Sequence, residues 1–212
     1  HFFLFFHWMK GVSAAIGGAA TALAGLGTAS VSSYADLEQN VGGIETLFKG
    51  SADKVIKNAE NAYKTAGMSA NQYMETVTGF SASLLQSLGG DTDKAADVAD
   101  MALTDMADNA NKMGTSMESI QYAYQGFAKQ NYTMLDNIKL GYGGTKEEME
   151  RLLSDAQKIT GVKYDISNLN DVYQAIHVIQ GQLGITGTTA KEAASTISGS
   201  VSSMKSAFDN FL

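Results

Sequence analysis

The sequence predicts an all-α protein, a multi-helix array of short amphipathic helices preceded by an apolar helix of small residues. Its 212 residues include no proline, which breaks helix interiors, whereas average usage of about 5% would give roughly ten. Apolar residues recur at intervals of three and four, the spacing of one helix face. Glycine stops followed by Ser, Thr or Asp caps separate these runs at 67/69, 90/91, 114/115, 144/145 and 187/189.

Residues 1–9 form an aromatic leader that does not resemble the rest of the chain. We interpret it as upstream sequence translated in frame, because Met9 is the first residue that can start translation. The alternative is an apolar anchor that leads into the next segment. A signal peptide is disfavoured, since the basic residue Lys10 follows the aromatic run instead of preceding it.

Residues 10–44 are predicted to form an apolar Gly/Ala-rich helix and a connector. Gly11 to Ala35 contains no charged residue and exceeds the roughly 20 residues that span a bilayer. The alternative, a small-residue helix packed against other helices in protein, stays open because large apolar groups are few. Those predicted to contact a membrane are Val12, Ile16, Leu23, Leu26 and Val31.

Residues 45–212 are predicted to form a helical domain long enough to bury a core. Its first helix, over 52–66, ends at Gly67. The second begins with a capping box formed by Ser69 and Gln72, in which each side chain bonds the other residue's backbone N–H. Their predicted buried faces comprise Ala52, Val55, Ile56, Ala59, Ala62, Tyr63 and Ala66, and then Tyr73, Val77, Phe80, Ser81, Leu84 and Leu88.

The third helix is expected to begin at Asp91 or Thr92 and to end at Gly114. Small residues dominate its buried stripe, so another helix can approach it closely. The stripe comprises Ala95, Ala99, Ala102, Met106, Ala110 and Met113. The aspartates of this helix fall largely outside the stripe and are predicted to form a solvated face: Asp91, Asp93, Asp97, Asp100, Asp105 and Asp108.

Two further capping boxes, Thr115 with Glu118 and Thr145 with Glu148, are predicted to open the next helices. Gly161 is the expected stop of the second of these. Their apolar faces are Ile120, Tyr124 and Phe127, and then Met149, Leu152, Leu153 and Ala156.

The stretch 131–144 is less regular, and residues 162–166 alternate as an extended segment does. A following helix is predicted from Leu169, Val172, Tyr173, Ile176, Ile179 and Leu183. Thr189 with Glu192 forms a fourth box before the last helix. The seam of that helix runs to the end without a cap, so we expect a truncated C-terminus; it comprises Ile197, Val201, Met204, Phe208 and Phe211.

The composition argues against several function classes. Without cysteine, the chain has no disulfide scaffold, thiolate zinc site or cysteine nucleophile. His177 is the only histidine outside the leader, so the sequence offers little from which to build a Ser-His-Asp triad. We expect His177 to be a partly buried or surface histidine. A net charge of -7, from 15 basic and 22 acidic residues, disfavours specific nucleic-acid binding.

Two motif-like stretches fail their tests, and we expect no metal, no cofactor and no catalytic residue. An EF-hand loop starting at Asp91 would need glycine at its sixth and glutamate at its twelfth position, which are Ala96 and Ala102. Gly141–Lys146 has Thr-Lys where a Walker loop has Gly-Lys-Ser/Thr. We interpret this stretch as a flexible turn before a helix.

Several long blocks make a family resemblance specific. Residues 33–49 read SYADLEQNVGGIETLFK, and residues 124–137 read YQGFAKQNYTMLDN. These blocks resemble tail tape measure proteins of siphophages and prophages of Gram-positive bacteria. The resemblance covers roughly residues 10–212, and its further blocks are 63–74, 80–90, 108–114, 140–145, 187–194 and 199–205.

The resemblance implies a structural and non-enzymatic role for a helical domain in the N-terminal part of a longer chain. Tape measure proteins lie inside the tail tube, set tail length and assist delivery of the genome. The implied partners are the tail tube protein, tail assembly chaperones and other tape measure copies. Contact with the host membrane is implied during ejection, after assembly in the host cytoplasm.

Two other function classes stay open on the sequence alone. The apolar N-terminal segment is compatible with a membrane-active helical protein unrelated to tails, such as a pore-former or a secreted toxin. A domain associated with peptidoglycan hydrolysis would need an acidic residue in a cleft with aromatic side chains, for which Glu75 and Glu118 are the candidates.

Overall fold

The computed structural model describes residues 27–196 and confirms the all-α class, with no β-strand among these residues. The chain divides into two compact units, 1–39 and 40–212, and residues 40–196 are the described part of the second unit. The helices are α2 (Gly27–Phe48), α3 (Ala52–Thr65), α4 (Ala70–Ser87), α5 (Thr92–Met113), α6 (Met117–Phe127), α7 (Lys146–Thr160) and α8 (Leu169–Gln182). Short 3-10 helices span Lys49–Ser51 and Leu135–Ile138, and residues 188–196 are helical.

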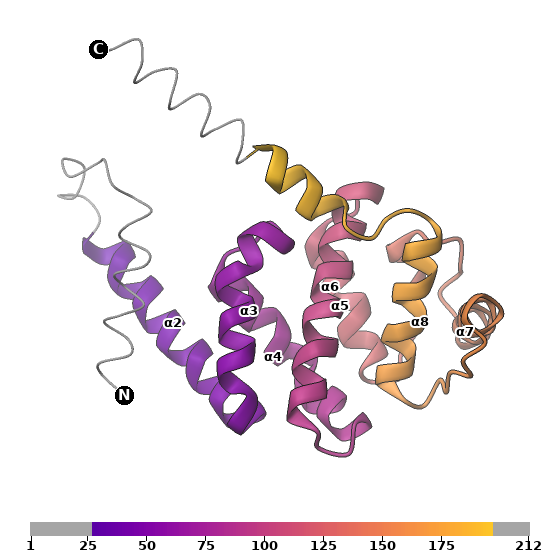
Figure 1. Ribbon diagram of the computed structural model, residues 1–212, viewed down its shortest axis with the longest axis horizontal. Coiled ribbons are helices and arrows are strands. Elements are labelled where there is room, and N and C mark those ends of the chain that lie inside the picture. Colours follow the sequence, from indigo (N-terminus) through magenta and orange to yellow (C-terminus); the bar gives the residue numbers. More distant parts are fainter. Residues whose placement is uncertain (1–26, 197–212) are drawn as a thin grey trace, which may run out of the picture. The chain divides into compact units, whose positions relative to one another are not determined.

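α5 lies at the centre of this unit and contacts α3, α4, α6 and α8 (Figure 1). Of the predicted small-residue stripe, Ala95, Ala99, Ala102 and Met106 are fully buried, whereas Ala110 and Met113 at its C-terminal end are half-buried. Since alanine extends only to Cβ, neighbouring helices approach its backbone closely. Aromatic rings then fill the space between α4, α6 and α8: Tyr173 packs edge-on to Phe80 at 5.5 Å and against Tyr124 at 5.1 Å between ring centroids.

Three predicted helix boundaries are confirmed in atomic detail. The Ser69 hydroxyl accepts the Gln72 N–H at 3.3 Å, while the Gln72 side-chain oxygen accepts the Ser69 N–H at 3.1 Å, which completes the capping box. Asp91 caps α5 by accepting the Lys94 N–H at 3.0 Å. Gly161 ends α7 in the left-handed conformation that glycine adopts without a steric penalty.

The predicted box of Thr115 and Glu118 is wrong. Ser116 is the capping residue, and its hydroxyl accepts the Ser119 N–H at 3.3 Å. Because the helix begins one residue later than predicted, the third helical position is Ser119, and the carboxylate of Glu118 instead accepts the Tyr122 hydroxyl at 3.1 Å.

The box of Thr145 and Glu148 is half formed. The Thr145 hydroxyl accepts the Glu148 N–H at 3.2 Å. The Glu148 carboxylate does not return to Thr145, because it accepts the Gly143 N–H at 2.9 Å and pairs with Arg151. The predicted face of α7 is confirmed, since Met149, Leu152, Leu153 and Ala156 are buried.

Predicted burial is wrong for Tyr63 of α3, which is 52% exposed, and it fails at two helix ends. Leu88 is half-buried and Leu183 is 51% exposed, because each is the residue at which its helix terminates and the apolar face no longer continues. Residues 161–165 are irregular and pair with no strand in the described part of the chain.

The prediction of a solvated aspartate face on α5 is wrong for its C-terminal half. Asp105 is 1% exposed and Asp108 is fully buried. α8 and the segment that follows it cover this side of α5, and each carboxylate there receives its own hydrogen-bond donors. Asp93 and Asp97, in the N-terminal half, are exposed as predicted and pair with Lys54 at 3.0 and 2.8 Å.

Several predictions fall on residues outside the described range. Val12, Ile16, Leu23 and Leu26 of the expected membrane-contacting set lie there, whereas Val31 falls within α2. The predicted seam from Ile197 to Phe211 also lies outside. Within residues 27–196, no helix has the combined length and apolar character of a membrane span.

Candidate functional site

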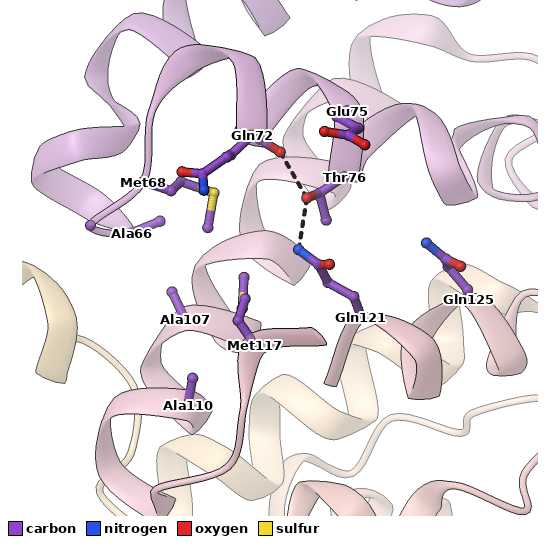
Figure 2. A pocket seen from close by; sticks show the side chains of 11 residues that line it. Ala66, Met68, Gln72, Glu75, Thr76, Ala107, Ala110, Met117, Gln121 and Gln125 are labelled. Carbon is purple, nitrogen blue, oxygen red and sulfur yellow. Dashed lines mark hydrogen bonds between the residues drawn. The ribbon is translucent and has the colours of Figure 1, made fainter. Parts of the chain in front are cut away.

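A hollow of about 460 Å³ opens among α4, α5, α6 and the turn between α3 and α4 (Figure 2). Its floor consists of small residues of α5, Ala107 and Ala110. Its walls carry thioether and amide groups, which suit contacts with neutral partners: Met68, Gln72, Met117, Gln121 and Gln125. We call this hollow the glutamine groove.

Hydrogen bonds fix one wall of the glutamine groove. The Thr76 hydroxyl donates to the Gln72 carbonyl at 2.7 Å and accepts the Gln121 side-chain amide at 2.9 Å (Figure 2). This bridge joins α4 to α6. On the same wall, Gln125 packs so closely on Gly79 that a Cβ there would lie 2.9 Å from its amide nitrogen.

Among the described residues, the glutamine groove is lined by one titratable side chain, the exposed Glu75, and by no aromatic ring. Glu118 is exposed on α6 and does not line the groove. The two glutamates considered for peptidoglycan hydrolysis therefore do not share this pocket. Most glycosidases use two carboxyl groups that flank the scissile bond, and the described lining of the groove supplies one, that of Glu75.

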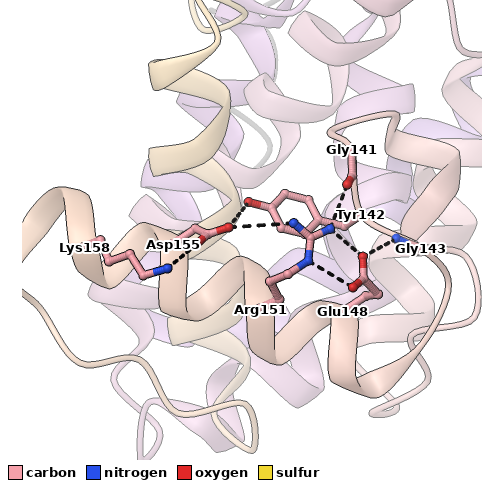
Figure 3. A network of polar contacts seen from close by, with 7 residues as sticks. All are labelled: Gly141, Tyr142, Gly143, Glu148, Arg151, Asp155 and Lys158. Carbon is pink, nitrogen blue, oxygen red and sulfur yellow. Dashed lines mark hydrogen bonds and ion pairs between the residues drawn. The ribbon is translucent and has the colours of Figure 1, made fainter.

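A second group of polar residues fastens the loop 139–145 to α7 (Figure 3). The Arg151 guanidinium lies 4.2 Å from the centroid of the Tyr142 ring, donates to the Gly141 carbonyl at 2.8 Å and donates to Glu148 at 3.0 Å. The Gly143 N–H donates to Glu148 as well. In a phosphate-binding loop this amide would donate to the bound anion. Here it already donates to the Glu148 carboxylate.

The charges in this network are mutually compensated. The hydrogen bond from Arg151, followed by that from Gly143, lowers the pKa of Glu148 to about 2. Partial burial and the hydrogen bond to Asp155 raise the pKa of Tyr142 to about 12. The ammonium of Lys158 lowers the pKa of Asp155. Each group therefore keeps its ordinary charge state at neutral pH, and the contacts of the network hold the loop 139–145 against α7. We call this network the clasp.

A third polar cluster lies between α5 and α8. His177 bonds the buried carboxylate of Asp105 through Nδ1. Burial raises the pKa of Asp105, and the hydrogen bond to Asp105 raises the pKa of His177. Among the described residues, Asp105 is the hydrogen-bond partner of the His177 ring, and no hydroxyl bonds it there.

The sequence predicted a partly buried or surface histidine at 177, and His177 is partly exposed, but the sequence did not reveal its partner. Asp105 lies 72 residues earlier, and no local pattern marks it. In the described residues, no three potential ligands among His, Asp and Glu converge on a metal-sized position. Asp91 and Asp93, from the rejected calcium interpretation, cap α5 and pair with Lys54 respectively.

Comparison with models of known protein families, with curated proteins and with solved structures gives no match to this chain.

Proposed function

We propose that this chain is a structural component of a phage tail, a part of a tape measure protein that sets tail length inside the tail tube and assists genome delivery into the host. The observation that carries the proposal is the set of sequence blocks that resemble this family. Several of them coincide with helix junctions: residues 63–74 include the end of α3 and the Ser69 cap, and residues 108–114 end at the stop of α5.

The dimensions of the helices limit what this part of the chain can do in such a protein. α5 has 22 residues, which correspond to about 33 Å of helix. A unit of short packed helices is far shorter than the same residues in one continuous helix. The proposal therefore assigns the ruler function to the parent chain, and to residues 40–196 a folded unit within it.

Such a unit would contribute surfaces that contact other proteins, and it would add little to the length of the parent chain. The glutamine groove and the exposed Tyr122 and Met134 beside it offer amide, thioether and aromatic groups for protein contacts. The proposed partners are the tail tube protein, the tail assembly chaperones and other tape measure copies. The proposed location is the tail lumen, with host cytoplasm during assembly and host membrane contact during ejection.

The first experiment measures the protein composition and the length of the tails made by the parent prophage. Peptides of this chain are expected in purified tails by mass spectrometry. Lengthening the parent gene with in-frame helical sequence is expected to lengthen the tails in electron micrographs in proportion to the added residues. Tails of unchanged length that contain the lengthened chain would contradict the ruler function.

The alternatives are tested on the chain itself. Leakage of liposomes by the chain in the absence of any tail would favour a membrane-active protein. A peptide of residues 10–35 that neither partitions into liposomes nor becomes helical with lipid would contradict membrane contact by this segment. Clearing of cell-wall substrate that is lost in Glu75→Gln or Glu118→Gln would favour a hydrolase.

A further inference from the structure

Asp108 joins two segments that lie far apart in the sequence. Its carboxylate is fully buried on α5. One oxygen accepts the Gly187 N–H at 2.5 Å and the other accepts the Thr189 N–H at 2.8 Å. These two amides lie at the start of the helix over 188–196, where backbone N–H groups have no acceptor within their own helix. Asp108 is therefore the cap of a helix that begins 80 residues later.

The local cap predicted for this helix does not form. The Thr189 hydroxyl is buried and has no hydrogen-bond partner in the described structure, so the box with Glu192 is wrong. The Thr188 hydroxyl donates to the Ile185 carbonyl at 2.8 Å and, less closely, to the Asp108 carbonyl at 3.4 Å. The first turn therefore depends on the Asp108 carboxylate, which α5 supplies. The negative charge of this carboxylate also interacts favourably with the positive end of the helix dipole.

The rest of this helix is weakly attached. Residues 191–196 are mostly exposed, whereas Ile185, just before the helix, is 1% exposed and anchors the end of the α8 segment in the core. Between them, Gly187 has a φ of 83°, which is in the left-handed region. The boundary between the anchored core and the exposed helix therefore lies at residues 186–187.

We propose that Asp108 is a latch: its carboxylate holds the helix 188–196 on α5, and loss of its two hydrogen bonds frees that helix about Gly187 while α3 to α8 stay folded. The latched helix also lies against one end of the glutamine groove. The Cγ2 atom of Thr189 lies 3.4 Å from the position of a Cβ on Gly67, which lines that end. Release of the helix removes this contact with the turn between α3 and α4, where Gly67 is already exposed.

The test is hydrogen exchange of individual amides in the full chain, measured by NMR. Asp108→Asn replaces one accepting oxygen with an NH₂ group, so the side chain keeps an acceptor for only one of the two N–H groups of Gly187 and Thr189. Exchange at Gly187 and Thr189 is expected to rise at least about fivefold, as for the loss of a capping side chain, with α5 and α8 unchanged. The matched control is Asp97→Asn, which removes an exposed carboxylate from the same helix and is expected to leave both amides protected.

A second variant avoids the buried position. Gly187→Ala introduces a side chain at positive φ with open space around it, so it strains the attachment without crowding the core. Trypsin cleavage after Lys191 is expected to accelerate in both Asp108→Asn and Gly187→Ala. Gly161→Ala imposes the same kind of strain at the end of α7 and is expected to leave this cleavage unchanged.

Two outcomes would overturn the latch. One is unchanged protection of Gly187 and Thr189 in Asp108→Asn, since the carboxylate would then not hold the helix. The other is a rise in exchange of equal size throughout α5 and α8, together with faster cleavage after Lys94 and Lys112, because the helix would then open only when the whole unit unfolds.

Discussion

His177 of α8 holds its Nδ1 atom 2.9 Å from one carboxylate oxygen of Asp105 on α5 and 3.0 Å from the other. Asp105 is 1% exposed, whereas the His177 side chain is 38% exposed. The pair thus ties a buried acid to a histidine at the edge of the core. Both pKa values are raised, that of Asp105 chiefly by burial and that of His177 chiefly by the hydrogen bond to Asp105.

The raised pKa values predict that stability falls as the pH rises. The folded state binds both protons more tightly than the unfolded state does, so the free energy of unfolding decreases as these protons are lost. The contribution of His177 is complete below its ordinary pKa of 6.5 and is lost as the pH rises through its higher folded value. Urea denaturation at about pH 6 and about pH 8.5 measures the difference.

The variant His177→Gln removes the titrating ring from this pair. The decrease in unfolding free energy between the two pH values is expected to shrink in this variant. Asp105→Asn combined with His177→Gln gives the coupling energy of the pair in a double-mutant cycle. An NMR titration of the His177 ring that gives a pKa below 6.5 would contradict the assignment.

Neighbouring glycines in the loop before α7 are predicted to differ sharply in tolerance. A Cβ on Gly144 would overlap the backbone carbonyl of Thr133, which cannot move away as a flexible side chain can. A Cβ on Gly143 meets only the Glu148 side chain, at 3.5 Å. Gly144→Ala is expected to lower the unfolding free energy by roughly 2–4 kcal/mol, and Gly143→Ala by less than about 1 kcal/mol. Equal losses for the two variants in urea denaturation would contradict this prediction.

The alanine stripe of α5 is predicted to resist enlargement. Ala102 is fully buried at the centre of the helix that contacts four others. Ala102→Leu adds three carbon atoms to a close-packed position and is expected to cost about 1–3 kcal/mol or more. Ala82→Leu, at an exposed position of α4, is the matched control and is expected to change stability by less than about 0.5 kcal/mol. Thermal denaturation followed by circular dichroism compares them.

Arg151 is predicted to control the ionisation of Glu148. The pKa of Glu148 is lowered to about 2 by its hydrogen bonds, so its contribution to stability is present above its ordinary pKa of 4.5 and is lost as the pH falls through about 2. Arg151→Lys keeps the charge but loses the planar fork that bonds Glu148 and Gly141 together. The pKa of Glu148 is expected to rise towards 4.5 in this variant, as measured by NMR titration of its side-chain carboxyl carbon. An unchanged value would assign the low pKa to Gly143 alone.

The helices and their limits follow from local rules in the sequence. The Ser69 box, the Asp91 cap and the glycine stop at 161 were predictable because each depends on residues within a few positions of one another. The Thr115 box failed by one residue, because Thr115 and Ser116 are both good caps and only the backbone conformation selects between them. The alanine stripe was predictable because helical periodicity alone places its members on one face.

The candidate sites were much less predictable. The glutamine groove combines residues of α4, α5 and α6, and periodicity counts its glutamines as ordinary surface residues. The clasp at Arg151 was missed, since the sequence interpretation treated Gly141–Lys146 as a flexible turn.

By itself, the sequence determined an all-α chain, the order of its helices and most of the faces that they bury. These properties depend on hydrogen bonds and side-chain spacing within single helices, so they can be predicted without knowing how the helices pack together. Only the tertiary structure decided that Asp105 and Asp108 are buried, because in the sequence they resemble the exposed aspartates at 93 and 97 of the same helix. Burial of a carboxylate depends on the donors that other elements bring to it, and here His177, Gly187 and Thr189 arrive from segments at least 70 residues away.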